Sequence, residues 1–413
     1  MSKFNRYFLM EDEQDIAQYV KEKTTMFAPD AVLTVKEIGD GNLNYVFLVK
    51  EEATKKSIIV KQAGEALRIS AAMRISTDRN RIEAEILELQ NKFAFGLVPK
   101  IYGYDICMCA MLMEDLTRFQ LMRYALMNFE TFPNFAEHIT TYMVNTLLAT
   151  TDAIMNPKDK KELQKRFVNP ELCEITEDLV LTEPYNDCKN RNIIDPLIKD
   201  FVQKELYDDK ALHLEIAKLK FDFMTNTQAL LHGDLHTGSI FVTPEETKIF
   251  DPEFAFYGPI GYDIGNIIAN LFFAWNRGNA YGEQSFCNWT LKAIEDVVDL
   301  FNEKFLRYFK ENVRDTMAKT EQFAESYLTR IMTDTASYAG TELIRRTVGM
   351  AQVKDITTIE DEQKRATAQK INILCAKKMI MNSKTFKIDK DFTNALLEAT
   401  RMGNANAIRQ QEV

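Results

Sequence analysis

The sequence predicts an α+β protein of two lobes, with a sheet in the N-terminal lobe (residues 1–115) and mainly helices in the C-terminal lobe (residues 116–413). Three observations lead to this prediction. Short apolar runs typical of strands, such as residues 31–35 and 57–63, are concentrated before residue 115. Most of the chain after residue 120 has the apolar spacing of amphipathic helices. A length of 413 residues is enough for two or three packed units.

Composition excludes several classes of protein. A hydrophobic content of 46% and a charged content of 27% are ordinary for a soluble globular protein. No apolar stretch reaches the length that spans a bilayer, and residues 1–6 lack a signal-peptide core, so we expect a cytoplasmic protein that does not bind a membrane. The net charge of -10 argues against general nucleic-acid binding. The six cysteines are scattered, which favours reduced thiols.

The first chemical signal in chain order is a glycine-rich turn within residues 37–49. It has the pattern G-x-G-x-x-N at Gly39, Gly41 and Asn44, and alternating apolar runs flank it. A glycine-rich hairpin can approach phosphates closely and point backbone N–H groups at them. The pattern alone is weak, because an ordinary β-turn has the same composition. No P-loop pattern occurs anywhere in the chain.

A lysine and a helix follow this turn. Lys61 stands in the apolar strand 57–63, where a lysine is often only an edge charge. Residues 78–93 have the spacing of an amphipathic helix, with Asp78 as the expected N-cap. Glu83 or Glu85 on this helix could form an ion pair with Lys61, and the local spacing favours Glu83.

The remainder of the N-terminal lobe reads as two more strands, over residues 97–105 and 107–113. The run ends at Glu114-Asp115-Leu116. From residue 120 to 230 the pattern is mostly helical, for example over residues 138–155 and 201–224.

Residues 229–253 carry the strongest signal in the chain. An apolar run leads into a polar loop, HGDLHTGS, which contains Asp234. Two short β-prone runs separated by Pro244 then predict a hairpin, and Asp251 and Glu253 follow its second strand. The hairpin brings its ends together, so three carboxylates are expected in a small space. Such a cluster is unfavourable without a cation, and a magnesium ion with a nucleotide would suit it.

Three features stand out after the hairpin. Asp263 lies at the expected start of a helix, where a carboxylate can serve as a simple cap. Trp275 ends an aromatic helical run, for which core packing is the default interpretation. Arg345 and Arg346 lie in a helical segment, and adjacent helical residues point about 100° apart. One arginine can therefore face inward while the other faces solvent, and an isolated pair of arginines is more commonly a surface charge pair.

The order H-G-D, hairpin, D-x-E resembles the catalytic core of the protein-kinase-like fold, and most closely its small-molecule branch of aminoglycoside, choline and sugar kinases. Within that branch, HGDLHTGS followed by DPEFAFYGPIGYDIGN resembles the 5-methylthioribose kinase family of methionine salvage. The resemblance covers nearly the whole chain. It implies a two-lobed protein-kinase-like fold, with an antiparallel-sheet N-terminal lobe and a mainly helical C-terminal lobe.

The resemblance implies ATP and Mg²⁺ as cofactors. Two carboxylates, Asp251 and Glu253, would bind the metal. Ser239 stands where protein kinases have an asparagine metal ligand, so Glu253 would take over part of that role. The resemblance assigns nucleotide binding to the glycine-rich loop, to a lysine that contacts the phosphates with its glutamate partner, and to the hinge. These residues are Gly39, Gly41, Asn44, Lys61, Glu83, Glu114 and Leu116.

For the acceptor, the resemblance implies 5-methylthioribose phosphorylated at its anomeric hydroxyl. Asp234 would orient that hydroxyl and accept its proton, and Arg345 or Arg346 would stabilise developing negative charge or hold the sugar. Trp275 could close one wall of the acceptor pocket. Asp263 resembles the buried acid that holds the catalytic loop through backbone N–H groups. A homodimer is implied by resemblance only.

Two alternatives remain open at this point. The first is a kinase of the same fold that acts on an aminoglycoside or choline. These acceptors are cations that need carboxylates or an aromatic cage, and the twin arginine argues for a neutral or oxygen-rich acceptor instead. The second is a nucleotide-binding pseudo-enzyme, which is disfavoured because Lys61, Asp234 and Asp251 are all present.

Overall fold

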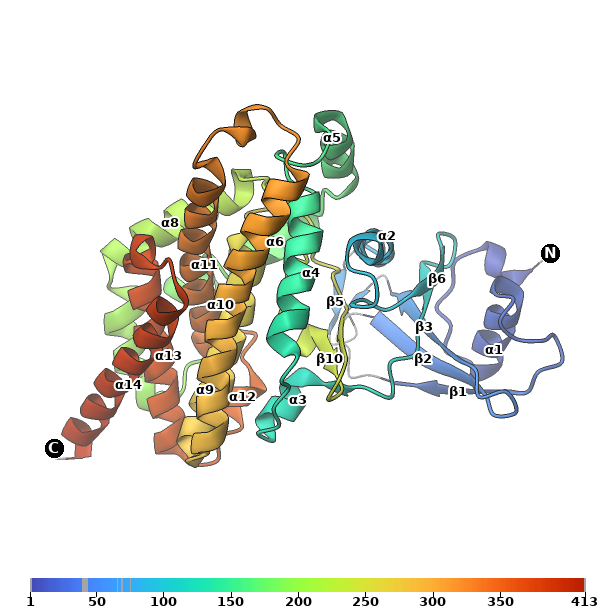
Figure 1. Cartoon of the computed structure of the whole chain (residues 1–413). Coiled ribbons are helices and arrows are strands. Elements are labelled where there is room, and N and C mark those ends of the chain that lie inside the picture. The colour runs from blue at the N-terminus through green and yellow to red at the C-terminus, as the bar shows by residue number, and fades with distance from the viewer. Residues whose placement is uncertain (1, 39–43, 65, 68–69, 75, 412–413) are drawn as a thin grey trace. The chain divides into compact units, whose positions relative to one another are not determined.

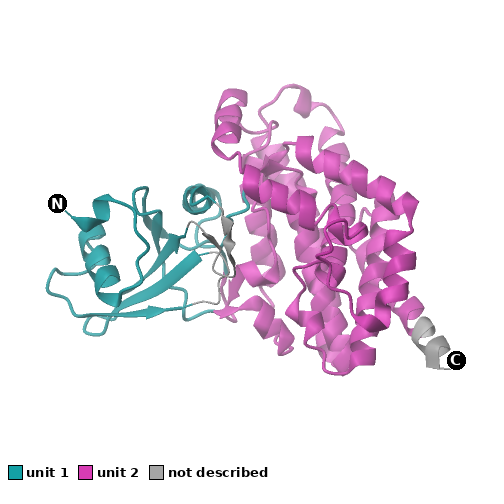
Figure 2. Ribbon diagram, turned by 180° about the vertical axis from the view of Figure 1, so that it is seen from behind, with its two compact units in different colours: residues 1–119, 248–255 teal, residues 120–247, 256–413 magenta. Residues whose placement is uncertain are grey.

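The computed structural model describes residues 2–38, 44–64, 66–67, 70–74 and 76–411. It forms two compact units: residues 1–119 with 248–255, and residues 120–247 with 256–413 (Figure 2). The segment 248–255 groups with the N-terminal residues because its backbone is bonded to them, with the N–H of Ile249 donating to the carbonyl of Leu97 at 2.7 Å. The division expected at residue 115 does not include this return of the chain.

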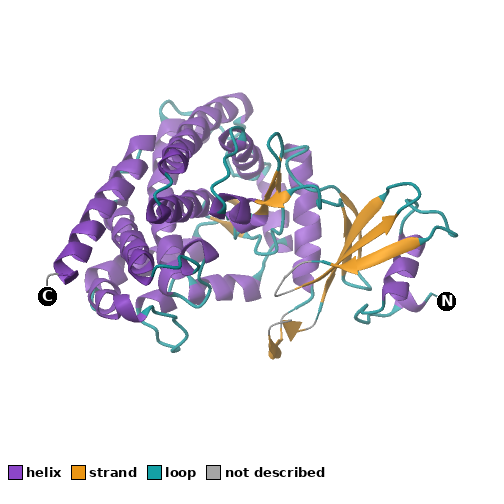
Figure 3. Cartoon of the chain, turned by 90° about the horizontal axis from the view of Figure 1, so that it is seen from below, coloured by secondary structure: helices purple, strands orange, loops and turns teal. Residues whose placement is uncertain are grey.

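The first unit is built on a five-stranded antiparallel sheet of strand order β1–β2–β3–β7–β6 (Figure 3). The bounds of its strands are β1 (Leu33–Glu37), β2 (Asn44–Glu51), β3 (Ser57–Ala63), β6 (Ile101–Asp105) and β7 (Ala110–Met113). Every residue of the central strand β3 after Ser57 is buried, which explains its continuous apolar run. A separate two-stranded ribbon joins β4 (Ala66–Leu67) and β5 (Ser70–Arg74).

Two α-helices complete the first unit. Helix α1 (Glu13–Lys23) follows the short turn η1 (Lys3–Asn5), and its buried face joins one apolar core with β1, β2 and β3. Helix α2 (Asp78–Phe93) packs against β3, β6 and β7 and has the bounds predicted from the sequence. The predicted N-cap of α2 is wrong. The cap is Thr77, because the Asp78 carboxylate instead accepts two hydrogen bonds from Arg81, at 2.6 and 2.7 Å.

The second unit is mainly helical (Figure 1). Its α-helices are α3 (Met122–Met127), α4 (Phe135–Ala149), α5 (Pro157–Arg166), α6 (Pro170–Leu179), α7 (Lys199–Val202), α8 (Lys210–Thr225), α9 (Gly261–Tyr281), α10 (Gln284–Asn312), α11 (Phe323–Val348), α12 (Lys354–Thr357), α13 (Glu362–Met381) and α14 (Asp389–Gln411). Shorter turns are η2 (Glu183–Tyr185), η3 (Pro196–Ile198), η6 (Met317–Lys319) and η7 (Ser383–Thr385). The helix expected over residues 201–224 is interrupted by η4 (Gln203–Tyr207), and Asp209 then caps α8 by accepting from the N–H of Leu212 at 3.0 Å.

The hairpin predicted after the HGD loop is confirmed. Strand β10 (Ile240–Val242) is followed by β11 (Thr247–Ile249), and β8 (Gln120–Leu121) pairs with β10 on its other side. The N–H of Thr243 donates to the carbonyl of Glu246 at 2.9 Å, which closes the turn. The loop itself runs from β9 (Ala229–Leu230), which pairs with β12 (Tyr257–Gly258), to the turn η5 (Thr237–Ser239). Both ends of the loop are therefore fixed by backbone pairing.

Helices α9 and α11 approach each other closely through two glycines. A Cβ atom on Gly261 would lie 2.5 Å from the backbone nitrogen of Thr335, and one on Gly265 would lie 2.6 Å from that of Ala339. Such distances leave no room for a side chain, so glycine permits this packing. Asp263 lies between the two glycines on α9, and the twin arginine lies further along α11. The packing thus places both features in one part of the second unit.

The long helices of the second unit pack on one another, with α11 against α9 and α13, and α10 against α9. Of the helices in the described ranges, none has the combination of length and apolar character that a membrane span requires. All six cysteines are free.

Candidate active site

Lys61 lies in the central strand β3, and its side chain is buried in the first unit. Its Nζ is 2.6 Å from Glu83 Oε2 on α2 and 2.5 Å from Asp251 Oδ1. Burial by itself would lower the pKa of Lys61, but the neighbouring carboxylates of Asp251 and Glu83 raise it well above its usual value. Lys61 therefore stays protonated, and the expected ion pair with Glu83 is present.

The choice between Glu83 and Glu85, which the sequence left open, is settled by helix geometry. Glu83 is fully buried on the face of α2 toward the sheet. Glu85 lies two residues later, on a different face of the helix, where its carboxylate accepts from Arg81 Nη1 at 2.7 Å.

Three carboxylates of the first unit lie close together around Lys61. One oxygen from each of Glu83, Asp251 and Glu253 lies within 4.8 Å of the others. Burial raises the pKa of Glu83 to about 7 and, together with Asp251, that of Glu253 to about 8. The positive charges of Lys61 and Arg79 therefore do not fully offset the effect of burial on the pKa of these two acids. Carboxylate oxygens at this spacing fit a hard divalent cation such as Mg²⁺. We refer to these four residues as the Lys61 cluster.

The backbone at Asp251 contributes to this arrangement. Its φ is +66°, a left-handed conformation that is uncommon outside glycine but is tolerated by aspartate. The carboxylate turns toward Lys61 directly after β11. Glu253 is held by Asn44, whose Nδ2 donates to Glu253 Oε2 at 3.2 Å, and Arg79 Nε lies 3.8 Å from the same oxygen.

The other residues predicted to bind nucleotide are placed as follows. Gly39 and Gly41 lie outside the described residues. Asn44 is buried at the start of β2, with its amide on Glu253. At the expected hinge, the N–H of Glu114 donates to the carbonyl of Lys100 at 2.8 Å, and the Glu114 side chain accepts from the N–H of Lys100 at 3.0 Å. The hinge residue Leu116 is buried.

The HGD loop in the second unit is held by Asp263, as predicted. Asp263 Oδ2 accepts from the N–H of His232 at 2.7 Å, and its Oδ1 accepts from the N–H of Gly233 at 3.0 Å. Gly233 has a φ of +87°, so the loop turns sharply here. His232 also supports the loop, because its Nδ1 accepts from the N–H of Asp234 at 3.4 Å. These bonds fix the backbone on both sides of Asp234.

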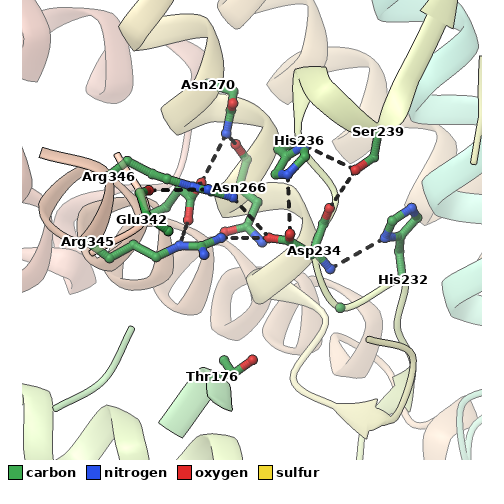
Figure 4. Close-up of polar contacts among 12 residues, drawn as sticks. Thr176, His232, Asp234, His236, Ser239, Asn266, Asn270, Glu342, Arg345 and Arg346 are labelled. Carbon is green, nitrogen blue, oxygen red and sulfur yellow. Dashed lines mark hydrogen bonds and ion pairs between the residues drawn. The ribbon is translucent and has the colours of Figure 1, made fainter. Parts of the chain in front are cut away.

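The Asp234 carboxylate is surrounded by cationic and donor groups (Figure 4). Its Oδ1 is 2.6 Å from Arg345 Nη2 and 3.4 Å from Arg346 Nη2, and its Oδ2 is 3.2 Å from His236 Nε2. Burial alone would raise the pKa of Asp234, but contact with His236 and the two arginines lowers it well below its ordinary value. The carboxylate is therefore ionised at neutral pH.

Both of the twin arginines face inward, although their separation of about 100° on a helix would also let one of them face solvent. Both side chains are buried, and both reach Glu342 as well as Asp234. Glu342 precedes them by three and four residues on α11, and helical residues at these two spacings lie on either side of the same position. A carboxylate at Glu342 can therefore draw both guanidinium groups to one side of the helix.

Glu342 and Asn270 are parts of this site that the sequence analysis missed. Glu342 is fully buried between the two arginines, and Asn270 Nδ2 donates to its Oε1 at 3.3 Å (Figure 4). The E-x-x-R-R spacing could have pointed to Glu342, since it is an i, i+3, i+4 ion-pair pattern. Nothing local marks Asn270. We refer to Asp234, His236, Glu342, Arg345 and Arg346 as the Asp234 cluster.

Two further predicted residues take ordinary contacts. Ser239 Oγ donates to the backbone carbonyl of Asp234 at 3.1 Å and lies 3.1 Å from His236 Nδ1, so it braces the loop. Trp275 is buried on α9, and its carbonyl lies 3.7 Å from Cys287 Sγ of α10. Within the described ranges, Trp275 Nε1 has no hydrogen-bond partner.

Known proteins are similar to this chain over most of its length. The phosphotransferase enzyme family model matches residues 34–286. A methylthioribose kinase of Geobacillus sp. (strain WCH70) is 40% identical over 381 residues, which are 91% of this chain and 94% of that protein. A methylthioribose kinase of Yersinia pseudotuberculosis (serotype O:1b, strain IP 31758) is 38% identical over 89% and 91% of the two chains. Among solved structures, an ethanolamine kinase of Plasmodium vivax is 17% identical, with a TM-score of 0.46 over 88% and 91% of the two chains.

Proposed function

Since this chain belongs to the phosphotransferase enzyme family and to the methylthioribose kinases, we propose that it transfers the γ-phosphoryl group of ATP to the anomeric 1-hydroxyl of 5-methylthioribose. The products are ADP and 5-methylthioribose 1-phosphate, and the reaction serves methionine salvage. The acceptor comes from the relatives, whose matches extend over about nine-tenths of the chain. The chemistry of phosphoryl transfer is what the two clusters support.

Asp234 is the proposed catalytic base. The acceptor oxygen attacks the γ-phosphorus, the bond from that phosphorus to the bridging oxygen of ADP breaks, and the proton of the acceptor hydroxyl passes to a carboxylate oxygen of Asp234. The contacts with His236, Arg345 and Arg346 keep Asp234 ionised, which a base requires. The bonds from Asp263 to the loop hold it in place while the acceptor binds.

Arg345 and Arg346 are proposed to stabilise the transferring phosphoryl group, with Arg345 also contacting the sugar. Guanidinium groups suit this role because they are always charged and offer several donors in a plane. Their burial adds to the effect, since charge interactions strengthen where water is excluded. Trp275 is proposed as a wall of the acceptor pocket.

The Lys61 cluster is proposed to hold the nucleotide. Lys61 would contact the α- and β-phosphates, positioned by Glu83, while Asp251 and Glu253 would bind Mg²⁺. When bound, the metal ion neutralises the charge of the phosphates. The oxygen-only donor set and the raised pKa values of Glu83 and Glu253 support this fit.

The remaining nucleotide contacts are assigned to backbone and loop groups. Gly39, Gly41 and Asn44 would enclose the phosphates, and the backbone at Glu114 and Leu116 would receive adenine. The side chain of Glu114 is already bonded to Lys100 and lies 3.4 Å from Lys248 Nζ, which supports a backbone role at the hinge.

The observation that carries the proposal is the ionised, loop-fixed carboxylate of Asp234 with two buried arginines on it. A coupled ADP-release assay with ATP and Mg²⁺ tests it, using 5-methylthioribose, ribose, choline and kanamycin as acceptors. We expect turnover on 5-methylthioribose and loss of that turnover in Asp234→Ala. Preference for choline or kanamycin would retain a kinase and refute the acceptor. Lack of turnover on all four acceptors would refute the proposed function.

We also propose a homodimer in the cytoplasm, on the basis of resemblance to the methylthioribose kinases. Light scattering after size-exclusion chromatography tests the oligomeric state. A mass near twice the chain mass of 47.7 kDa supports the dimer, and a mass near that of one chain refutes it.

A further inference from the structure

Glu342 is an acidic residue in the Asp234 cluster that has no assigned role in the reaction. It is fully buried on α11, and each of its oxygens serves a different arginine. Arg345 Nε donates to Oε2, and Arg346 Nε donates to Oε1 at 3.0 Å. The Nη2 groups of the same two arginines reach Asp234. Each guanidinium thus bridges two carboxylates, one on its own helix and one on the loop.

Asn270 fixes the direction in which Glu342 points. The Asn270 amide oxygen accepts from Arg123 Nη2 at 3.0 Å and from Thr237 Oγ1 at 3.2 Å. With its oxygen committed to two donors, Asn270 must turn Nδ2 toward Glu342 and the carbonyl of Asn266. A buried asparagine with these partners cannot flip without losing several hydrogen bonds. The position of Glu342 is therefore set from α9 and not only from its own helix.

Charge balance gives Glu342 a specific consequence for Asp234. The two arginines carry two positive charges, which Glu342 and Asp234 neutralise together. Although burial works against ionisation, contact with the arginines lowers the pKa of Glu342. If Glu342 were neutral, Asp234 would be the counter-ion of both guanidinium groups. It would be held more tightly, and one Nε donor would lose its acceptor.

We propose that Glu342 is a positioning residue for acceptor phosphorylation. It anchors Arg345 and Arg346 by their Nε groups, so that both arginines stay oriented when their Nη groups leave Asp234 for the phosphate. Asp234 can then turn to the acceptor hydroxyl. The inference rests on the kinase function proposed above. It goes beyond that function by assigning a role to a carboxylate that acts through the two arginines.

The first test is Glu342→Gln, which preserves shape and removes the charge. We expect kcat with 5-methylthioribose to fall about 100-fold, because the arginines lose orientation for the transition state. The KM for ATP should stay within about two-fold, since Glu342 does not belong to the Lys61 cluster. A kcat within about three-fold of the wild type, or a rise in KM alone, overturns the proposal.

A matched control separates the effect from the general loss of an ion-paired carboxylate. Glu295 on α10 lies 2.6 Å from Lys390 Nζ and accepts from Thr393 Oγ1 at 3.1 Å, and both of these partners lie outside the Asp234 cluster. Glu295→Gln should leave kcat unchanged. If both variants lose stability and kcat in parallel, the role of Glu342 is structural and the proposal fails.

A double-mutant cycle asks whether Glu342 acts through the arginines. We expect Glu342→Gln combined with Arg346→Lys to be within about two-fold of the more impaired single variant, because residues that act as a unit are not additive. Multiplication of the two defects would mean that Glu342 acts independently, which overturns the proposal.

An independent readout distinguishes failure of this inference from failure of the proposed function. With ¹⁵N-labelled arginine, the two Nε–H groups bonded to Glu342 should exchange slowly with water, and Arg345→Lys and Arg346→Lys assign them. Glu342→Gln should accelerate exchange of at least one of the two. If the wild type phosphorylates none of the acceptors, the proposed function fails while this readout still decides the anchoring. Unchanged protection of both groups in Glu342→Gln overturns the inference even if the wild type is active.

Discussion

Arg345 Nη2 lies 2.6 Å from Asp234 Oδ1, so the proposed catalytic base is also an ion-pair partner of this arginine. The two residues come from different elements, the HGD loop and the far end of α11. The other oxygen of Asp234 faces His236 Nε2 at 3.2 Å. An acceptor hydroxyl must therefore compete with a bonded donor for Asp234. Arg346 Nη2 lies further from the same oxygen than Arg345 Nη2 does, so substitutions of the two arginines should have different effects.

The first prediction concerns the unequal distances of the twin arginines from Asp234. Arg345→Lys should lower kcat/KM for the acceptor by about 100 to 1,000-fold, and Arg346→Lys by only about ten-fold, because Arg346 Nη2 is further from Asp234 Oδ1, at 3.4 Å. Steady-state kinetics with varied acceptor measures both values.

Arg330→Lys, a change at a surface ion pair on the same helix, provides the control and should be close to the wild type. Equal losses at Arg345 and Arg346, or a larger loss at Arg346, would contradict the assignment of Arg345 as the closer partner of the acceptor.

The second prediction concerns the charge balance of the Lys61 cluster. Lys61→Met leaves Glu83, Asp251 and Glu253 without the buried lysine between them, and should destabilise the first unit by about 3 to 5 kcal/mol at pH 8. Added Mg²⁺ should restore more thermal stability to Lys61→Met than to the wild type, because the three carboxylates can then share the ion. Thermal unfolding with and without Mg²⁺ measures both effects.

Lys56→Met removes an exposed lysine just before β3 and should be nearly neutral in both conditions. If Mg²⁺ stabilises Lys61→Met no more than it stabilises the wild type, the three carboxylates do not form a cation site.

Much of this site could be predicted because its signals are local. The HGD loop, the hairpin and the D-x-E sequence lie within residues 229–253, where turn residues and β-prone runs specify the path of the chain. The ion pair of Lys61 with Glu83 was also within reach, since a strand lysine facing a helix leaves few candidate partners. The role of Asp263 was implied by resemblance to the buried acid of protein-kinase-like folds, whereas its place at a helix start indicated only a simple cap.

What the sequence could not supply depends on packing between distant segments. The burial of both arginines follows from the position of Glu342 one turn earlier and from Asn270 on another helix, and the periodicity of α11 alone points the arginines apart. In the sequence, Asn270 is one of many polar residues in segments predicted to be helical. It contacts Glu342 only because α9 packs against α11. The return of residues 248–255 to the first unit is likewise a tertiary event that no local pattern encodes.

The third prediction concerns Asp263 and the loop it holds. In Asp263→Asn, one of the two N–H groups of His232 and Gly233 faces an amide donor instead of a carboxylate oxygen. We expect a loss of about 1 to 3 kcal/mol in stability. We also expect faster amide hydrogen exchange in residues 229–236, and kcat about 100-fold lower because Asp234 loses its fixed position.

Asp296→Asn on α10 removes a surface partner of Lys292 and should change none of these quantities measurably. Unchanged exchange at His232 and Gly233 in Asp263→Asn would show that the loop is held by other contacts.

The fourth prediction concerns pH and a buried acid outside both clusters. Asp334 on α11 is largely buried, and burial and Asp222 raise its pKa to about 7, against the weaker effect of Arg330 at 3.8 Å. Because its pKa in the folded state exceeds that in the unfolded state, Asp334 contributes stability that is complete below about pH 4. This contribution is lost as the pH rises through about 7.

Asp334→Asn imitates the protonated acid and removes this dependence. The variant should therefore gain stability over the wild type as pH rises from 4 to 8, by up to about 4 kcal/mol, and the gain should level off above the folded-state pKa. Scanning calorimetry of the unfolding transition across this range measures the difference. Tyr338, whose hydroxyl bonds to Leu219 and Asp222, keeps its partners in the variant, so a gain with this pH profile reports on Asp334 itself. A difference that is independent of pH would mean that Asp334 is ionised in the folded protein throughout the range.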